Sequence, residues 1–75
     1  MKLTELKKGQ MAQIDQVLGE SGFQERLCEM GLAPGANVSL KARLPFKGPL
    51  VMRVESTTLA LRLEEADLIE VKLNG

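Results

Sequence analysis

Residues 21–38 read SGFQERLCEMGLAPGANV and contain the local signals that decide the fold. Ser21 is a favourable residue for capping the N-terminus of a helix, and Gln24 follows it at the spacing of a capping box. An apolar face then recurs at helical spacing, formed by Phe23, Leu27 and Met30. The pattern predicts one short α-helix over about residues 22–30.

The same stretch also contains the signals that end a helix. Gly31 stands where a helix commonly closes in the left-handed conformation that glycine adopts most easily. Leu32 follows it and can make the apolar contact back to the last helical turn that accompanies such an ending. Pro34 then prevents the helix from continuing. We therefore expect a tight turn over residues 31–35 that leads from the helix into a strand.

Outside the helix, apolar and polar residues alternate, which is the period of a half-buried strand. The clearest example is residues 38–44, where Val38, Leu40, Ala42 and Leu44 fall on one face. Residues 45–49 read PFKGP and predict a turn with two fixed prolines and a freely turning Gly48. Further strands are predicted at about residues 10–18, 50–54, 58–63 and 69–73.

About five short strands in so short a chain predict a mainly β fold, closed into a small barrel with one inserted helix. The helix is expected to cover one end of the barrel. The side chains expected to point inward are Ile14, Phe23, Leu27, Val38, Leu40, Met52, Val54, Leu61, Ile69 and Val71. The 75 residues fit a single domain over residues 1–75.

The composition excludes several classes of protein. The chain has no His and one Cys, so it lacks the residues for His-based catalysis, for an intramolecular disulfide and for a zinc clip. No phosphate-binding glycine loop is present, and we therefore expect no enzymatic activity. No signal peptide is recognisable, and the free thiol fits a reducing compartment, so a cytoplasmic location is expected.

The formal net charge of zero conceals an uneven distribution. Residues 36–54 contain four Lys or Arg side chains and no acid. Acids outnumber bases by one in residues 1–35 and by three in residues 55–75. The chain is therefore expected to present a basic region between two acidic ones.

Residues 26–38 (RLCEMGLAPGANV) resemble the R-L-x-x-M/L-G-L-x-P-G-x-x-V signature of the ferrous iron transport protein A family, FeoA. The turn at residues 45–49 resembles the P-x-x-G-P element of that family, and residues 59–71 resemble its ending. The resemblance implies an SH3-like barrel with an inserted helix. It also implies a stand-alone, cytoplasmic bacterial accessory protein that works with the membrane GTPase-transporter FeoB in ferrous iron uptake.

In this reading the chain is an interaction module without a cofactor. It would bind the cytoplasmic part of FeoB and reach the membrane only through that partner. The expected contact surface combines the rim of the helix with the two proline-containing turns. Leu32 and Phe46 are the expected apolar anchors, and the candidate partner-binding residues are Arg26, Met30, Leu32, Pro34, Phe46 and Lys47.

The main alternative is a sensor or regulatory domain that responds to a transition metal. Cys28, or the carboxylates of Glu64, Glu65 and Asp67, could contribute ligands, so weak binding of Fe²⁺ or another divalent ion stays open. One thiol is only a single ligand, however, and the three acids are also typical of a helix start. No metal site is therefore assigned.

Nucleic acid is not an expected partner. Lys41, Arg43 and Arg53 could form a basic stripe on paired strands. Barrels that bind single strands also place aromatic side chains among the basic ones for stacking on bases. Here only Phe46 could serve in this way.

Overall fold

A computed structural model describes residues 1–74 as a mainly β protein with one antiparallel five-stranded sheet. The strand order is β4-β3-β2-β1-β5. The strands are β1 (Met11–Val17), β2 (Asn37–Arg43), β3 (Leu50–Val54), β4 (Thr57–Leu61) and β5 (Ile69–Leu73). A 3₁₀ turn η1 (Leu3–Glu5) precedes them, helix α1 (Ser21–Glu29) joins β1 to β2, and the single turn α2 (Leu63–Ala66) joins β4 to β5.

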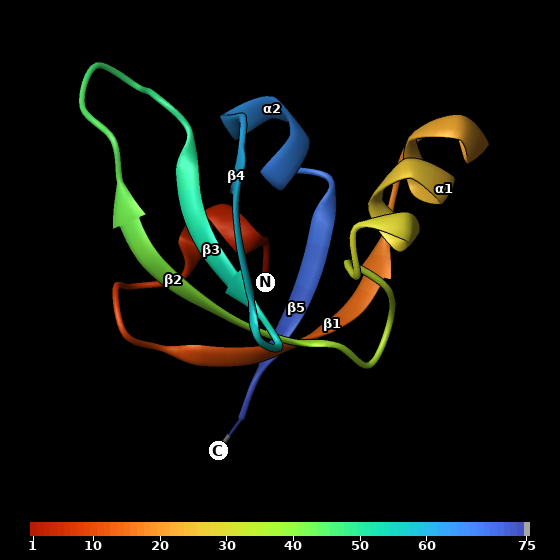
Figure 1. Cartoon of the computed structure of the whole chain (residues 1–75), viewed down its shortest axis with the longest axis horizontal. Helices are drawn as coiled ribbons and strands as arrows, with labels where there is room; N and C mark the ends of the chain where they lie inside the picture. The colour runs from red at the N-terminus through yellow and green to blue at the C-terminus, as the bar shows by residue number, and fades with distance from the viewer. Residues whose placement is uncertain (75) are drawn as a thin grey trace.

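The sheet is strongly curved, so that its two edge strands approach each other (Figure 1). The edge strands β4 and β5 are neighbours in sequence, and α2 bridges them across the open side. The N-terminal segment lies against β5, where the backbone N–H of Val71 donates to the carbonyl of Met1 over 2.7 Å. The curvature and the bridging turn confirm the predicted barrel-like architecture.

The core lies inside this curved sheet. All of the side chains predicted to point inward are buried except Phe23, which is half-buried against the core. Several residues outside the predicted inward set are also buried, namely Leu3, Leu6, Ala12, Leu32, Leu50 and Ala66. Leu3 begins η1 and Leu6 follows it, so the N-terminal segment closes one opening of the barrel.

The strict alternation predicted for residues 38–44 is interrupted by a β-bulge. Leu40 pairs with Met52 and Ala42 pairs with Val51, so Lys41 is an additional residue in β2. A bulge changes the face on which the following residues lie. Leu44 is consequently 44% exposed, although the alternation predicted that it would be buried.

Candidate docking surface

The N-terminus of α1 differs from the prediction. The helix spans Ser21–Glu29, one residue earlier than expected at each end, and Glu20 rather than Ser21 occupies the N-cap. The N-cap side chain makes no hydrogen bond to the helix. Gln24 does not complete a capping box; its Nε2 donates to the carbonyl of Gly19 over 2.9 Å. The predicted cap at Ser21 was therefore wrong, because the loop before the helix is fixed by a different side chain.

The C-terminus of α1 confirms the predicted ending. Gly31 has a φ of 91°, and its N–H donates to the carbonyl of Cys28 over 2.9 Å. The N–H of Leu32 donates to the carbonyl of Leu27 over 2.8 Å. These two bonds form a Schellman motif, in which the side chains of Leu27 and Leu32 pack together. Both side chains are 0% exposed, so the turn is attached to the core.

The turn that follows is fixed to β1 by hydrogen bonds in both directions. The N–H of Gly35 donates to the carbonyl of Ile14 over 2.8 Å, and the N–H of Ile14 donates to the carbonyl of Ala36 over 2.9 Å. Gln13 Nε2 adds a bond of 3.2 Å to the carbonyl of Gly35. With its backbone held on one side by α1 and on the other by β1, this segment is preorganised for contact with another molecule.

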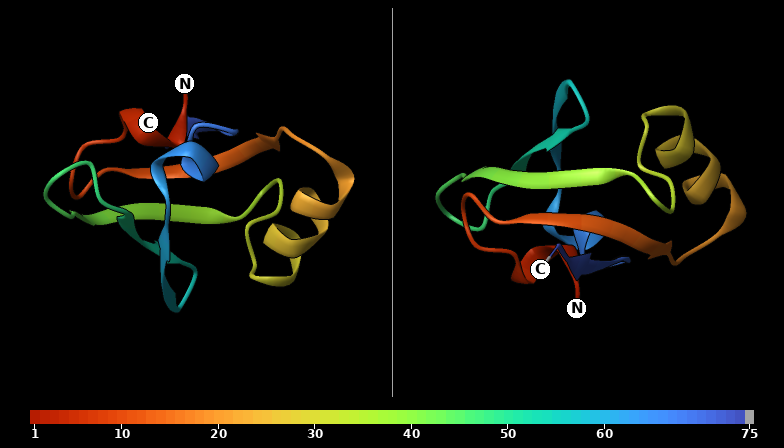
Figure 2. Two further views of the ribbon diagram at one scale, coloured as in Figure 1. Left: turned by 90° about the horizontal axis from the view of Figure 1, so that it is seen from above. Right: turned by 90° about the horizontal axis from the view of Figure 1, so that it is seen from below.

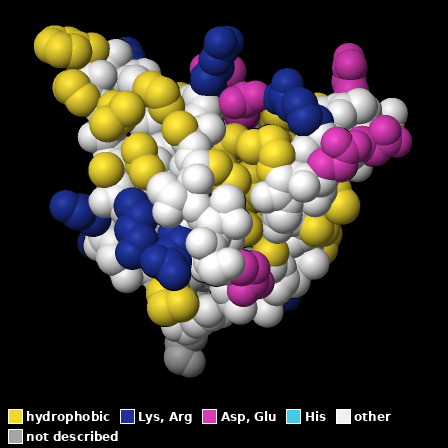
Figure 3. Space-filling model, in the orientation of Figure 1, with side chains coloured by type: hydrophobic (Ala, Val, Ile, Leu, Met, Phe, Trp, Pro, Cys, Tyr) yellow, Lys and Arg dark blue, Asp and Glu magenta, His cyan; other side chains and the backbone are white. Residues whose placement is uncertain are grey.

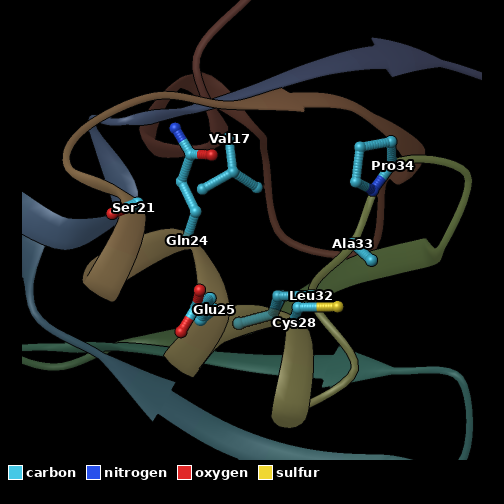
Figure 4. Close-up of a pocket in the computed structure, with 8 residues that line it drawn as sticks. All are labelled: Val17, Ser21, Gln24, Glu25, Cys28, Leu32, Ala33 and Pro34. Carbon is cyan, nitrogen blue, oxygen red and sulfur yellow. The ribbon is translucent and has the colours of Figure 1, made fainter.

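A shallow groove of about 350 Å³ lies between α1, the end of β1 and this turn (Figure 4). Helix α1 contributes one wall with Ser21, Gln24, Glu25 and Cys28. Val17 and the turn residues Leu32, Ala33 and Pro34 contribute the rest. The groove is thus mainly apolar, with amide, carboxylate and thiol groups along the helix. We call it the α1 groove.

The spacing of four helix residues is a sequence signal for this groove. Ser21, Gln24, Glu25 and Cys28 are spaced at i, i+3, i+4 and i+7, so they share one face of the helix. This stripe lies beside the stripe that packs on the core. Its residues are mostly polar, and a search for apolar periodicity therefore passes over it.

Arg26, predicted to bind a partner, instead makes its contacts within the chain. Its Nη2 lies 2.5 Å from Glu65 Oε2, and its guanidinium carbon lies 5.6 Å from the centre of the Phe23 ring. The ion pair joins α1 to α2, so Arg26 has a structural role at the rim. The candidates Met30 and Pro34 are exposed at the end of α1 and in the following turn.

The second proline-containing turn, residues 44–49, connects β2 to β3. Phe46 is 99% exposed, and both Phe46 and Lys47 have left-handed backbones with φ of 60° and 58°. Gly48 was predicted to supply the conformational freedom of this turn, but its φ angle lies outside the left-handed region. Glycine is needed there for space, because a Cβ atom would lie 2.9 Å from the carbonyl oxygen of Pro45.

The candidate residues do not form one surface. The turn of residues 31–35 precedes β2 and the turn of residues 44–49 follows it, and a strand of seven residues is about 20 Å long. Figures 1 and 2 show the two turns at opposite ends of the molecule. The predicted composite surface was wrong, and so was Leu32 as an exposed anchor, because its side chain is buried below the α1 groove.

Several of the charged groups named as candidates have partners within the protein. Arg43 donates to the carbonyls of Thr4 and Leu6 over 2.6 and 2.5 Å, so it is not free to extend the basic stripe of Lys41 and Arg53. Glu65 binds Arg26, and Asp67 accepts a hydrogen bond of 2.8 Å from the Thr4 hydroxyl. Within residues 1–74, no three His, Cys, Asp or Glu side chains are grouped so that they could hold a metal ion. The donor groups therefore do not fit a resident metal.

The FeoA domain matches residues 1–73 of the sequence. The chain belongs to the FeoA family. A relative from Porphyromonas gingivalis, the Fe(2+) transport protein A/Fe(2+) transporter FeoB fusion protein, is 36% identical over 73 residues. That alignment covers 97% of this chain but only 9% of the much longer fusion protein.

Solved structures of FeoA proteins share the fold. The solution structure of FeoA protein from Chlorobium tepidum superposes with a TM-score of 0.93 at 32% identity, over 100% of this chain and 71% of that one. The crystal structure of Stenotrophomonas maltophilia FeoA complexed with zinc superposes with a TM-score of 0.81 at 32% identity, over 96% and 89%. The latter is described as an SH3 domain protein and a candidate activating factor for ferrous iron transport, which agrees with the predicted SH3-like fold.

The FeoA signature of residues 26–38 coincides with a segment that hydrogen bonds attach to both α1 and β1. It contains the second half of α1, the Schellman motif, the turn fixed to β1 and the first two residues of β2. Ferrous iron transport is the process in which this family acts. No helix within residues 1–74 is long and apolar enough to cross a membrane.

Proposed function

We propose that this FeoA chain is a non-enzymatic, cytoplasmic accessory protein that binds the cytoplasmic part of a FeoB transporter and modulates ferrous iron uptake. The observation that carries the proposal is the fusion relative, in which transport protein A and FeoB are parts of one polypeptide. Two functions joined in one chain act at the same place, and separate chains with the same task must associate to reach the same arrangement.

We further propose that the α1 groove is the contact site. Its walls are held by the Schellman motif and by the bonds to β1, so binding would cost little conformational entropy. Val17, Ala33 and Cys28 offer small apolar surfaces, and Glu25 offers a charge at the edge. A groove of this kind fits a short apolar segment that carries a basic residue.

Co-purification with the cytoplasmic part of FeoB, with and without guanine nucleotide, tests the proposal. Ala33→Glu places a carboxylate in the α1 groove and is expected to weaken binding at least tenfold, because a charge would be desolvated against the partner. Ala60→Glu is the matched control, since Ala60 is exposed on the edge strand β4, away from the groove.

Two results would contradict the proposal at different levels. If the unmodified chain does not co-purify with the transporter under either nucleotide condition, the accessory role is wrong. If the chain binds but both alanine variants bind equally well, the role survives and the assignment to the α1 groove is wrong.

A further inference from the structure

The β2–β3 turn, opposite α1, exposes two large apolar side chains, and a third lies beside β2, where Met11 pairs with Ser39. Phe46 is 99% exposed at the tip of the β2–β3 turn, and Leu44 in the same turn is 44% exposed. Met11, at the start of β1, is 57% exposed. The turn before β1 lies beside β2, because the N–H of Gly9 donates to the carbonyl of Leu40 over 3.0 Å. We call this region the Phe46 end.

Positive charges lie on the β2–β3 turn and on the neighbouring segments. Lys7 and Lys8 lie in the turn before β1, Lys47 follows Phe46, and Lys41 occupies the bulge of β2. Lys8, Lys41 and Arg53 also line a groove of about 390 Å³ together with Met11. Within residues 1–74, none of these cationic groups lies within ion-pair distance of a carboxylate.

Acidic side chains predominate on α1, and outside it Glu55 lines a groove with Met11 and Arg53. Helix α1 and its N-cap contribute Glu20, Glu25 and Glu29, against a single Arg26 that is paired with Glu65. On the face in Figure 3, a cluster of Lys and Arg side chains lies on the left and most of the acidic side chains lie at the upper right, where two further basic groups adjoin them. A molecule with no net charge therefore has a positive and a negative end, which gives it a preferred orientation in an electric field.

We propose that the Phe46 end binds the surface of an anionic lipid bilayer directly, with Phe46 inserted among the lipid headgroups. Cations near an anionic leaflet are attracted to it individually, and an apolar side chain such as Phe gains by burial at the boundary between headgroups and acyl chains. The acidic α1 end would be turned away from the lipid. The inference goes beyond docking on FeoB and departs from the expectation that the chain reaches the membrane only through its partner.

A lipid surface fits these observations better than an acidic protein does. Phe46 projects from a narrow turn with essentially all of its surface free, and a protein would need a matching pocket to bury it. The cations are distributed over the turn before β1, β2, β3 and the β2–β3 turn rather than grouped for one carboxylate. A continuous negative surface attracts dispersed cations without a specific carboxylate for each. This orientation also leaves the α1 groove free for the transporter.

Sedimentation of the full chain with vesicles tests the proposal without any transporter. The chain is expected to bind vesicles of phosphatidylcholine mixed with phosphatidylglycerol and not vesicles of phosphatidylcholine alone, and binding should fall as salt is raised. Phe46→Ser is expected to weaken binding at least tenfold. Lys41→Gln and Lys47→Gln should each weaken it about fivefold.

Two control variants make the same kinds of change elsewhere. One removes an apolar side chain near α1, and the other removes a cation that is already paired. Leu18→Ser removes an apolar side chain of 39% exposure beside α1, and Lys72→Gln removes a cation that lies 3.4 Å from Asp15 Oδ1. Both should bind vesicles within about twofold of the unmodified chain. Because Phe46 touches little of the protein, Phe46→Ser is expected to remain folded, which circular dichroism verifies.

The outcomes separate this inference from the proposed function. Equal binding of Phe46→Ser and the unmodified chain, or no binding to anionic vesicles, overturns it. If vesicles are not bound but Phe46→Ser fails to co-purify with FeoB, the Phe46 end binds an acidic protein and the lipid assignment is wrong. Retained vesicle binding by Ala33→Glu supports two independent surfaces, whereas its loss contradicts the proposed orientation.

Discussion

Two turns of similar composition flank β2, but one buries its large apolar side chain and the other exposes it. Residues 31–35 read GLAPG and residues 45–49 read PFKGP, so each turn places a large apolar residue among Gly and Pro. Leu32 in the first turn is 0% exposed, and Phe46 in the second is 99% exposed. Both stretches also belong to the elements that resemble the FeoA signature.

The difference arises from what each turn closes. The first turn ends a helix whose apolar stripe already lies on the core, and the Schellman bonds direct Leu32 onto Leu27. The second turn connects two strands beyond the end of the core, after a bulge has moved Leu44 outward. An apolar residue in a turn is therefore buried when the turn folds back on packed elements, and it is free for binding when the turn extends past them.

The largest effect that tests this comparison is on stability. Leu32→Ala is expected to lower the free energy of unfolding by about 2–5 kcal/mol, because it leaves a cavity below the α1 groove. Phe46→Ala is expected to change it by less than about 0.5 kcal/mol, since the Phe46 side chain packs on almost nothing. Urea denaturation followed by circular dichroism measures both variants.

Leu32→Met serves as the control, because it keeps most of the buried volume and should cost less than about 1.5 kcal/mol. A Phe46→Ala variant that is as destabilised as Leu32→Ala would show that the second turn also packs on the protein, and the comparison would fail.

The first turn could be predicted from the sequence because its signals are local. Gly31, Leu32 and Pro34 specify a Schellman ending and a stop within four residues, and the bonds follow that pattern. The bulge in β2 could not be predicted in this way, because it depends on how Leu40 and Ala42 pair with β3. Without the bulge the alternation placed Leu44 on the same face as Leu40, whereas the exposure of Phe46 was predicted correctly.

The candidate site was predicted only in part for a similar reason. Both turns were predicted to be contact sites, but they were expected to form one surface, although the full length of β2 separates them. Leu32 was predicted to be an exposed anchor because it is an apolar residue of the first turn, whereas the residues that form the surface above it include Ala33 and Cys28. Residue type indicates which side chains can bind a partner, and three-dimensional packing decides which of them are accessible.

The backbones of the two turns provide the next test. Gly31→Ala places a Cβ atom on a residue with a φ of 91° and is expected to cost about 1–2 kcal/mol. Lys47→Gly is expected to raise the free energy of unfolding, because Lys47 has a φ of 58° and glycine removes the strain of that conformation. The relief exceeds the added entropy of glycine in the unfolded chain, so a gain of about 0.5 kcal/mol is expected. Thermal denaturation of the two variants checks the opposite signs.

Ala33→Gly provides a reference for the entropy of glycine alone, because Ala33 has no left-handed backbone to relieve. It should be slightly destabilising. If Lys47→Gly is destabilised to the same extent as Ala33→Gly, then the second turn is not strained in solution.

Substitutions of two arginines, one at each end, are expected to lower stability with different dependence on salt. Arg43, at the Phe46 end, donates to two backbone carbonyls, and Arg43→Gln is expected to cost about 1 kcal/mol at low and high salt alike. Arg26, at the α1 end, pairs with a carboxylate at the surface, and Arg26→Gln is expected to cost about 0.5 kcal/mol. The Arg26 effect should shrink in high salt because exposed ion pairs are screened. Equal salt dependence of the two variants would contradict these assignments.

The smallest expected effect concerns Fe²⁺. Only the α1 end combines a thiol with carboxylates, since Cys28 and Glu25 both line the α1 groove. Stable binding of a transition metal needs several convergent ligands, and no group of three such side chains exists within residues 1–74. The nearby Glu65 is already engaged by Arg26. Anaerobic calorimetric titration with Fe²⁺ is therefore expected to detect no micromolar binding, and Cys28→Ser should leave the titration unchanged. Micromolar binding that Cys28→Ser abolishes would make the α1 groove a metal site, and would favour a metal-responsive sensor over a docking surface at this end of the molecule.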